Sequence, residues 1–253
     1  MLNKQKKYLG QHFLKNKTIL EEMARAAEIS KKDIVLEVGP GSGSLTEILA
    51  ERAGKVIAVE KDRDLIPYLH KKLKNFKNVK IVEGDILAKA VKPPLGGLTA
   101  KSYKIVANIP YYITSRFLRM FLSNPKLRPK LMVLMVQREV ADRILARDKK
   151  PACRQGRESL LSLSVKAYAR AEIIRRVSKN LFSPPPKVDS AIIKISLRRP
   201  TSKSEQILAL AKLAFQQKRK MLRHSLPWLS DSQVARKRPE ELSLEDWAKI
   251  VVK

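Results

Sequence analysis

Short apolar runs rich in β-branched residues alternate with segments of helical spacing through the middle of this chain, and no other feature constrains its fold as much. Five runs have the length and composition of buried strands: Ile34–Val38, Lys55–Val59, Val79–Val82, Lys104–Ala107 and Leu131–Val136. The helical segments beside them are Thr18–Ala27, Leu45–Arg52, Asp64–Lys74, Ser115–Leu122 and Arg138–Arg147. Because parallel strands need long crossover connections, which are usually helices, this order predicts an α/β protein.

Two further strand-like runs, Glu172–Val177 and Ala191–Leu197, flank a cluster of prolines at Pro184–Pro186. So short a connection is expected to join antiparallel neighbours, which would complete a seven-stranded, mostly parallel sheet. Beyond about residue 200 no strand pattern remains, and Gln206–Phe215 and Leu244–Val252 have helical spacing. The sequence therefore predicts one large domain over residues 1–200 and a small all-α domain over residues 201–253, with Trp228 and Trp247 in the core of the latter.

The charge of the chain points to a polyanionic partner. There are 53 Lys and Arg residues against 24 Asp and Glu in a chain of 253, so the net charge is +29. The basic residues are spread along the chain rather than gathered on one amphipathic helix, which favours nucleic acid over a membrane surface. The longest apolar run, Leu131–Val136, is too short to span a bilayer, and no apolar segment follows the basic N-terminus. We therefore expect a soluble, cytoplasmic protein without a membrane partner.

Cysteine and histidine are too few and too dispersed to suggest a metal centre. The chain has one cysteine, Cys153, and three histidines, His12, His70 and His224. One cysteine excludes a disulfide within the chain and an all-cysteine zinc site. We predict no metal and expect a monomer, because nothing in the sequence requires more than one copy.

A glycine-rich turn follows the first predicted strand of the sheet, at Gly39-Pro40-Gly41-Ser42-Gly43. Glycines at this place let the backbone turn sharply and approach a ligand closely, as in nucleotide-binding βα units. Glu60 ends the next strand, 21 residues after Gly39, where a carboxylate accepts hydrogen bonds from ribose hydroxyls. Asp85 and Ile86 follow the third strand, where the carboxylate is placed to meet the amino group of an adenine. The spacing G-x-G-x-G differs from the G-x-G-x-x-G typical of NAD sites.

A second motif, Asn108-Ile109-Pro110-Tyr111, ends the fourth strand. The exocyclic amine of a base is a poor nucleophile, because its lone pair is delocalised into the ring. An Asn oxygen and the next backbone carbonyl can each accept one N–H and free that lone pair. Pro110 stiffens the turn, and Tyr111 offers a ring on which an unstacked base can lie. In isolation this motif is more often a strand-ending turn, but its place behind the glycine turn, Glu60 and Asp85 favours catalysis.

With these motifs assembled, the chain resembles the small-subunit ribosomal RNA adenine dimethyltransferases, the KsgA family. The resemblance extends over nearly the whole chain and includes five motifs: Leu9–Leu14 (LGQHFL), Glu37–Thr46 (EVGPGSGSLT), Asn108–Ile113 (NIPYYI), Phe182–Ser190 (FSPPPKVDS) and Phe215–Leu222 (FQQKRKML). It implies a Rossmann-like class I methyltransferase fold, with an S-adenosylmethionine-dependent methyltransferase domain over residues 1–200 and a small helical rRNA-binding domain over residues 201–253.

The resemblance also implies a reaction and a set of site residues. The methyl donor would be S-adenosyl-L-methionine, and the product two adjacent N6,N6-dimethyladenosines in the 3′-terminal hairpin loop of small-subunit rRNA, made on the immature small subunit. Residues expected at the cofactor are His12, Leu14, Gly39, Gly41, Glu60, Asp85, Ile86 and Asn108. Residues expected to hold the target adenine are Asn108, Pro110 and Tyr111, with Phe182 as a second stacking face.

This chain departs from the family pattern at three places. His12 stands where Asn is usual, residues 151–159 keep Gly156-Arg157 but not the full Tyr-Gly-Arg-Leu-Ser, and Lys218 replaces an Arg. Two alternatives stay open. One is the erythromycin-resistance type of enzyme, which shares the NIPY motif and dimethylates one adenosine of 23S rRNA. The other is a non-catalytic RNA-binding assembly or transcription factor, against which the intact Glu60, Asp85 and Asn108–Tyr111 argue.

Overall fold

The computed structural model describes residues 12–14, 16–88, 102–145, 158–217, 219–229 and 232–251. Leu9–Gln11, residues 151–157 and Lys218, which were singled out above, lie outside these ranges. The chain divides into two compact units, Met1–Ala141 with Glu172–Leu197 and Asp142–Ala171 with Arg198–Lys253. The sequence places this boundary near residue 200, but it does not assign residues 142–171 to the second unit. They belong there because the helix Leu160–Tyr168 packs on two helices of the C-terminal segment.

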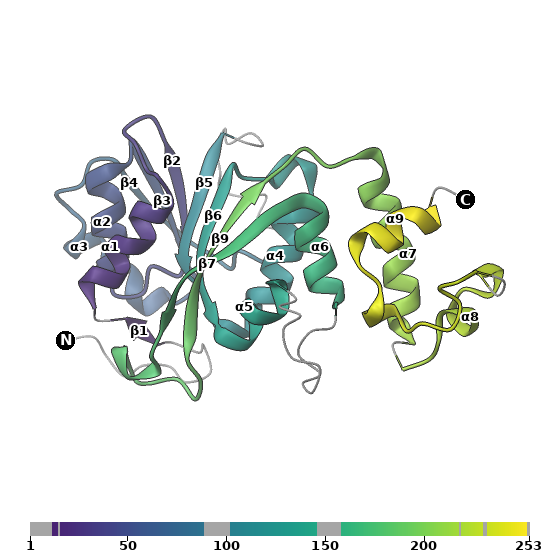
Figure 1. Ribbon diagram of the computed structural model, residues 1–253. Helices are drawn as coiled ribbons and strands as arrows, with labels where there is room; N and C mark the ends of the chain where they lie inside the picture. Colours follow the sequence, from purple (N-terminus) through teal and green to yellow (C-terminus); the bar gives the residue numbers. More distant parts are fainter. Residues whose placement is uncertain are drawn as a thin grey trace. The chain divides into compact units, whose positions relative to one another are not determined.

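The first unit is built on a seven-stranded sheet with the order β4-β3-β2-β5-β6-β9-β7 (Figure 1). The strands are β2 Ile34–Val38, β3 Lys55–Glu60, β4 Val79–Glu83, β5 Tyr103–Asn108, β6 Leu131–Gln137, β7 Ala169–Val177 and β9 Ser190–Leu197. The pairs β2–β3, β3–β4, β2–β5 and β5–β6 are parallel, and β6–β9 is antiparallel. The predicted seven-stranded, mostly parallel sheet is therefore confirmed, with β7 and β9 as neighbours.

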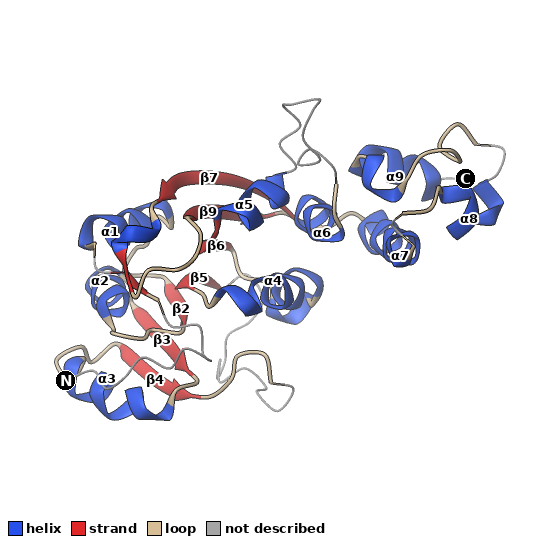
Figure 2. Cartoon of the chain, turned by 90° about the horizontal axis from the view of Figure 1, so that it is seen from below, coloured by secondary structure: helices blue, strands red, loops and turns tan. Residues whose placement is uncertain are grey.

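Helices cover both faces of this sheet, which explains why its central strands are mostly apolar. Helices α1 (Lys17–Ala26), α2 (Ser44–Arg52) and α3 (Ile66–Lys72) lie on one face, and α4 (Thr114–Ser123) lies on the other (Figure 2). Helix α5 (Arg138–Leu145) follows β6 directly. Helix α3 is shorter than the predicted Asp64–Lys74, because Asp62 caps a 3-10 turn over Arg63–Leu65 and Pro67 lies in the first turn of α3. No helix in the described part of the chain is long and apolar enough to cross a membrane.

A short antiparallel ribbon joins two segments that lie far apart in the sequence. Strand β1 (Phe13–Leu14) pairs with β8 (Phe182–Ser183), with Leu14 opposite Phe182. Both of these side chains are buried in a core cluster with residues of α1, α2 and β6. The apolar periodicity of the sequence does not predict this ribbon, because each strand has only two residues.

The second unit is helical and has its own core. Its helices are α6 (Leu160–Tyr168), α7 (Ser202–Gln216), α8 (Leu222–Ser225) and α9 (Leu244–Val251). No element is predicted for α6, because its Leu-Ser-Leu-Ser-Val run alternates like a strand; a capping box between Ser159 and Ser162 begins the helix. Trp247 is fully buried in this core, as expected, whereas the prediction for Trp228 was wrong, since it is 65% exposed.

The remaining short elements are single 3-10 turns, most of which join a strand or helix to the next element. They lie at Arg63–Leu65, Tyr111–Ile113, Pro125–Leu127, Lys179–Leu181, Pro227–Leu229 and Pro239–Glu241. The turn over Tyr111–Ile113 matters most for the site, because it begins three residues after β5 and leads directly into α4. It therefore fixes the direction in which the side chains of the NIPYYI motif leave the sheet.

Candidate active site

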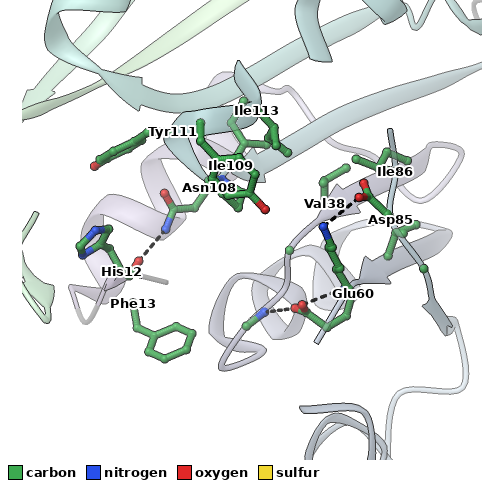
Figure 3. A pocket seen from close by; sticks show the side chains of 17 residues that line it. His12, Phe13, Val38, Glu60, Asp85, Ile86, Asn108, Ile109, Tyr111 and Ile113 are labelled. Carbon is green, nitrogen blue, oxygen red and sulfur yellow. Dashed lines mark hydrogen bonds and ion pairs between the residues drawn. The ribbon is translucent and has the colours of Figure 1, made fainter. Parts of the chain in front are cut away.

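A pocket opens in the first unit where the parallel strands β2, β3, β4 and β5 end, which is the usual ligand position in an open α/β sheet (Figure 3). Together with space open to solvent it holds about 790 Å³, the size of a small-molecule site. It brings together nine of the residues expected from the sequence: His12, Gly39, Gly41, Glu60, Asp85, Ile86, Asn108, Pro110 and Tyr111. Leu14 instead lines a smaller adjoining cavity, which Gly39 and Asn108 also line.

The glycine turn closes one wall of the pocket. The Gly39 N–H donates to the carbonyl of Val59 at 2.9 Å, which ties the turn to β3. Gly41 has a φ of +56°, and a Cβ there would lie 2.7 Å from Cε1 of Phe13. A side chain at this position is therefore strained in its backbone and also clashes with an aromatic ring. The turn requires glycine here for both reasons.

Glu60 is held rigidly at the end of β3. Its Oε2 accepts from the Gly41 N–H at 3.1 Å, and its Oε1 accepts from the N–H groups of Lys61 and Asp62 at 2.9 Å each. Burial raises the pKa of Glu60, against the effect of these three N–H donors. The carboxylate is thus fixed in one rotamer beside the glycine turn, and it lines the pocket as an acceptor for hydroxyl groups.

Asp85 lies after β4 and pairs with a residue that sequence reasoning missed. Its Oδ1 accepts from the Leu87 N–H at 2.9 Å, and its Oδ2 lies 2.9 Å from the Nζ of Lys61. Burial alone would raise the pKa of Asp85, but the Leu87 N–H and the Lys61 ammonium together lower it. The only sequence signal for Lys61 is that it directly follows Glu60 at a strand end.

These groups suit a nucleoside. The carboxylates of Glu60 and Asp85 lie on one side of the pocket, together with the apolar side chains of Val38 and Ile86 (Figure 3). Val59 also lines the pocket. A ribose needs acceptors for its hydroxyls, and an adenine needs flat apolar faces and an acceptor for its amino group. The donor and acceptor set therefore fits the nucleoside part of S-adenosyl-L-methionine.

Asn108 ends β5 on the opposite side of the pocket. Its Nδ2 donates to the main-chain carbonyl of His12 at 3.2 Å, so that the amide is oriented with Oδ1 away from this bond (Figure 3). The next residue, Ile109, is buried, and the carbonyl of Pro110 accepts from the Ile113 N–H at 3.1 Å. The side-chain oxygen of Asn108 is thereby presented as a fixed hydrogen-bond acceptor.

Tyr111 begins the 3-10 turn and is constrained at its hydroxyl and at one face. The hydroxyl lies 2.6 Å from the Oγ of Ser190, and the ring stacks on His12 with centroids 5.9 Å apart and planes 23° apart. His12 is itself held by a hydrogen bond from Nδ1 to the carbonyl of Pro184 at 2.8 Å. Burial raises the pKa of Tyr111, partly offset by Ser190, so the phenol stays neutral.

One expected catalytic residue is not brought to the pocket. Phe182 is 4% exposed in the β1–β8 ribbon, packed in the core opposite Leu14, and it is not among the pocket residues. The proline-rich segment reaches the site at its other end, through Ser190. The role of Phe182 as a second stacking face stays a prediction that the geometry of this pocket does not support.

A buried carboxyl group lies close to the glycine turn. Glu37 of β2 is 1% exposed and lines the smaller cavity, and its Oε2 has no hydrogen-bond partner among the described residues. Burial raises the pKa of Glu37 to about 8, repulsion by Glu60 adds to this, and the nearby Thr46 hydroxyl and Lys72 ammonium oppose it. Glu37 is therefore mostly protonated at neutral pH.

Known proteins resemble this chain over nearly its whole length. The model of the family described as "Ribosomal RNA adenine dimethylase" matches residues 2–249. A protein of Dehalococcoides mccartyi (strain CBDB1) named "Ribosomal RNA small subunit methyltransferase A" is 41% identical, over 98% of this chain and 87% of that protein. A protein of the same name from Clostridium botulinum (strain Loch Maree / Type A3) is 38% identical, over 96% of this chain and 92% of that protein.

Two solved structures have the same fold. A dimethyladenosine transferase from Plasmodium falciparum superposes with a TM-score of 0.77 at 28% identity, covering 95% of this chain and 96% of that one. The 23S rRNA methyltransferase ErmE superposes with a TM-score of 0.70, also at 28% identity, covering 95% of this chain and all of that one. The Rossmann-like methyltransferase fold predicted from the sequence is confirmed.

Proposed function

Because the chain belongs to the ribosomal RNA adenine dimethylase family, we propose that it transfers methyl groups from S-adenosyl-L-methionine to N6 of two adjacent adenosines in the 3′-terminal hairpin loop of small-subunit rRNA. The observation that carries this proposal is the anchored amide of Asn108. Its Nδ2 already donates a hydrogen bond to the carbonyl of His12, so Oδ1 is the atom left to accept a hydrogen bond from the substrate amine. The pocket around it also fits a nucleoside.

The cofactor would lie along the carboxyl ends of β2, β3 and β4. Glu60 would accept the ribose hydroxyls and Asp85 the adenine amino group, between the side chains of Val38, Val59 and Ile86. Gly39 and Gly41 keep the turn free of side chains where the cofactor passes. The cofactor would supply a methyl group on a sulfonium. The amine nitrogen would take this methyl group, the electrons of the broken carbon–sulfur bond would stay on sulfur, and the nitrogen would then lose a proton to water.

The residues of the NIPY motif would prepare the amine for this transfer. Asn108 Oδ1 and the carbonyl of Ile109 would each accept one N–H, which turns the nitrogen lone pair out of the ring plane. Tyr111 would hold the base by stacking, and Pro110 fixes the turn between these groups. No side chain forms a covalent bond in this scheme, so catalysis rests on positioning and on hydrogen bonds that strengthen as charge develops.

The second unit and the net charge support a large RNA substrate. A charge of +29 suits binding to phosphate groups, and we propose that the helical C-terminal segment contributes an rRNA-binding surface. The natural substrate would be an immature small subunit in the cytoplasm, bound by a monomer of this protein. The similarity to ErmE supports a second candidate, dimethylation of one adenosine in 23S rRNA. The relatives named for the small subunit, at 41% and 38% identity, favour the first.

Methyl-labelled S-adenosyl-L-methionine tests the proposal when it is offered with unmethylated small subunits, naked small-subunit rRNA and large-subunit RNA in parallel. Reverse transcription then maps the modified positions. Stops at two adjacent adenosines on small subunits alone are expected, and the Asn108→Ala variant should give none while its affinity for the cofactor changes by no more than a few fold. A stop only in large-subunit RNA would favour the second candidate. An active Asn108→Ala variant would refute the role assigned to Asn108.

A further inference from the structure

We infer that Ser190 is a positioning residue for methyl transfer, because its hydroxyl fixes the ring of Tyr111 in the pocket; this inference rests on the function proposed above. The two hydroxyl oxygens are 2.6 Å apart, although the residues are 79 positions apart in the sequence. Ser190 is not among the pocket residues, so it acts on the substrate only through Tyr111.

Ser190 is a rigid support. It is fully buried and is the first residue of β9, where it lies opposite Gln137 of β6 in the sheet. The preceding residue, Asp189, is held by two hydrogen bonds. Its carbonyl accepts from the Arg138 N–H at 2.9 Å, and its side-chain Oδ1 accepts from the Lys179 N–H at 3.1 Å. The hydroxyl of Ser190 is therefore placed by the sheet and not by a loop.

Tyr111 needs such a support. It lies in a three-residue 3-10 turn after β5, and its ring is half-buried beside the pocket. Stacking on His12 restrains one face of the ring, but stacked rings can slide and rotate within their plane. The bond to Ser190 at the far end of the ring removes this freedom. A base that stacks on Tyr111 is then held at a constant distance from Asn108 Oδ1, and transfer rates are sensitive to such distances.

This inference gives the FSPPPKVDS motif a function in the site. Phe182 at its beginning is packed in the core, and Pro184 and Ser190 hold His12 and Tyr111 through hydrogen bonds. The segment between β7 and β9 thus stabilises one wall of the pocket from behind without contact to the substrate.

A double-mutant cycle tests the inference, with Ser190→Ala, Tyr111→Phe and the double variant assayed on unmethylated small subunits. Because one hydrogen bond is lost, each single variant should have a kcat about three- to tenfold lower. The dissociation constant for S-adenosyl-L-methionine should stay within twofold. Since Tyr111→Phe already lacks the hydroxyl that Ser190 contacts, Ser190→Ala should have no further effect in that background. Ser196→Ala, in the same strand, serves as the matched control and should leave kcat unchanged.

Two results would overturn the inference. One is a Ser190→Ala variant with the wild-type kcat. The other is an equal loss in kcat from Ser190→Ala with and without the Tyr111 hydroxyl, accompanied by a lower melting temperature, which would mean that Ser190 only stabilises the sheet. Failure of the proposed function is distinguishable from both, because the wild-type protein would then methylate neither small subunits nor small-subunit rRNA.

Discussion

Replacing Glu37 by Gln should abolish a pH dependence of the free energy of unfolding that arises because the Glu37 carboxyl group is buried. Glu37 is 1% exposed, and its Oε2 has no hydrogen-bond partner among the described residues. Burial raises its pKa from 4.5 to about 8, with repulsion by Glu60 as a smaller contribution. A Gln side chain has nearly the same shape as a protonated Glu, but it does not titrate.

The sign of the effect follows from where the proton is held. The unfolded chain releases the Glu37 proton near pH 4.5, whereas the folded protein keeps it until about pH 8. Between these values the folded state binds more protons, so the stabilisation is complete below about pH 4.5 and is lost as the pH rises through about 8. At about 1.4 kcal/mol per pH unit, the loss between pH 5.5 and 7.5 is about 2 to 3 kcal/mol.

Urea unfolding followed by far-ultraviolet circular dichroism at several pH values measures this loss. The quantity to compare is the difference in the free energy of unfolding between wild type and Glu37→Gln, because titrating groups that do not interact with Glu37 cancel in it. This difference should shift in favour of Glu37→Gln by about 2 to 3 kcal/mol from pH 5.5 to 7.5. Glu51→Gln, an exposed change in the same unit, controls for the loss of one carboxylate and should shift little.

Parallel pH profiles for wild type and Glu37→Gln would refute the reasoning. They would mean that Glu37 is ionised in the folded protein, which requires a cation or water that stabilises the carboxylate inside the small cavity. The size of any constant offset between such parallel profiles would report only packing of the amide group.

Three further predictions concern the pocket. Asp85→Asn should weaken binding of S-adenosyl-L-methionine about tenfold or more in calorimetry, because a charged acceptor for the adenine amine is lost; unchanged affinity would remove Asp85 from the cofactor site. Gly41→Ala should lower the free energy of unfolding by about 1 to 2 kcal/mol, because it forces a positive φ on Ala and displaces Phe13; wild-type stability would contradict this. Phe182→Ala should cost about 3 to 5 kcal/mol of stability, as for a core residue; a loss of activity at wild-type stability would instead restore its predicted stacking role.

Most of the sheet could be read from the sequence because its central strands are buried on both faces. Continuous apolar runs such as Leu131–Val136 are strong local signals, and all seven predicted strands are present. Elements with weak or misleading local patterns were missed. Helix α6 alternates serine with apolar residues like a strand, and the two-residue strands β1 and β8 exist only because they pair with each other. Trp228 was placed in the core on residue type alone, although its surroundings leave it exposed.

The sequence by itself determined the order of strands and helices, the glycine turn and the polar residues at four strand ends. Parallel strands bring their carboxyl ends to one edge, so Gly39, Glu60, Asp85 and Asn108 had to converge. Only the tertiary structure decided which atoms of these residues already form hydrogen bonds within the protein. It also decided that Glu37 is neutral, and that Ser190 rather than Phe182 contacts Tyr111. The reason is physical: a side chain's charge and orientation depend on neighbours from distant segments, and local patterns contain no information about those neighbours.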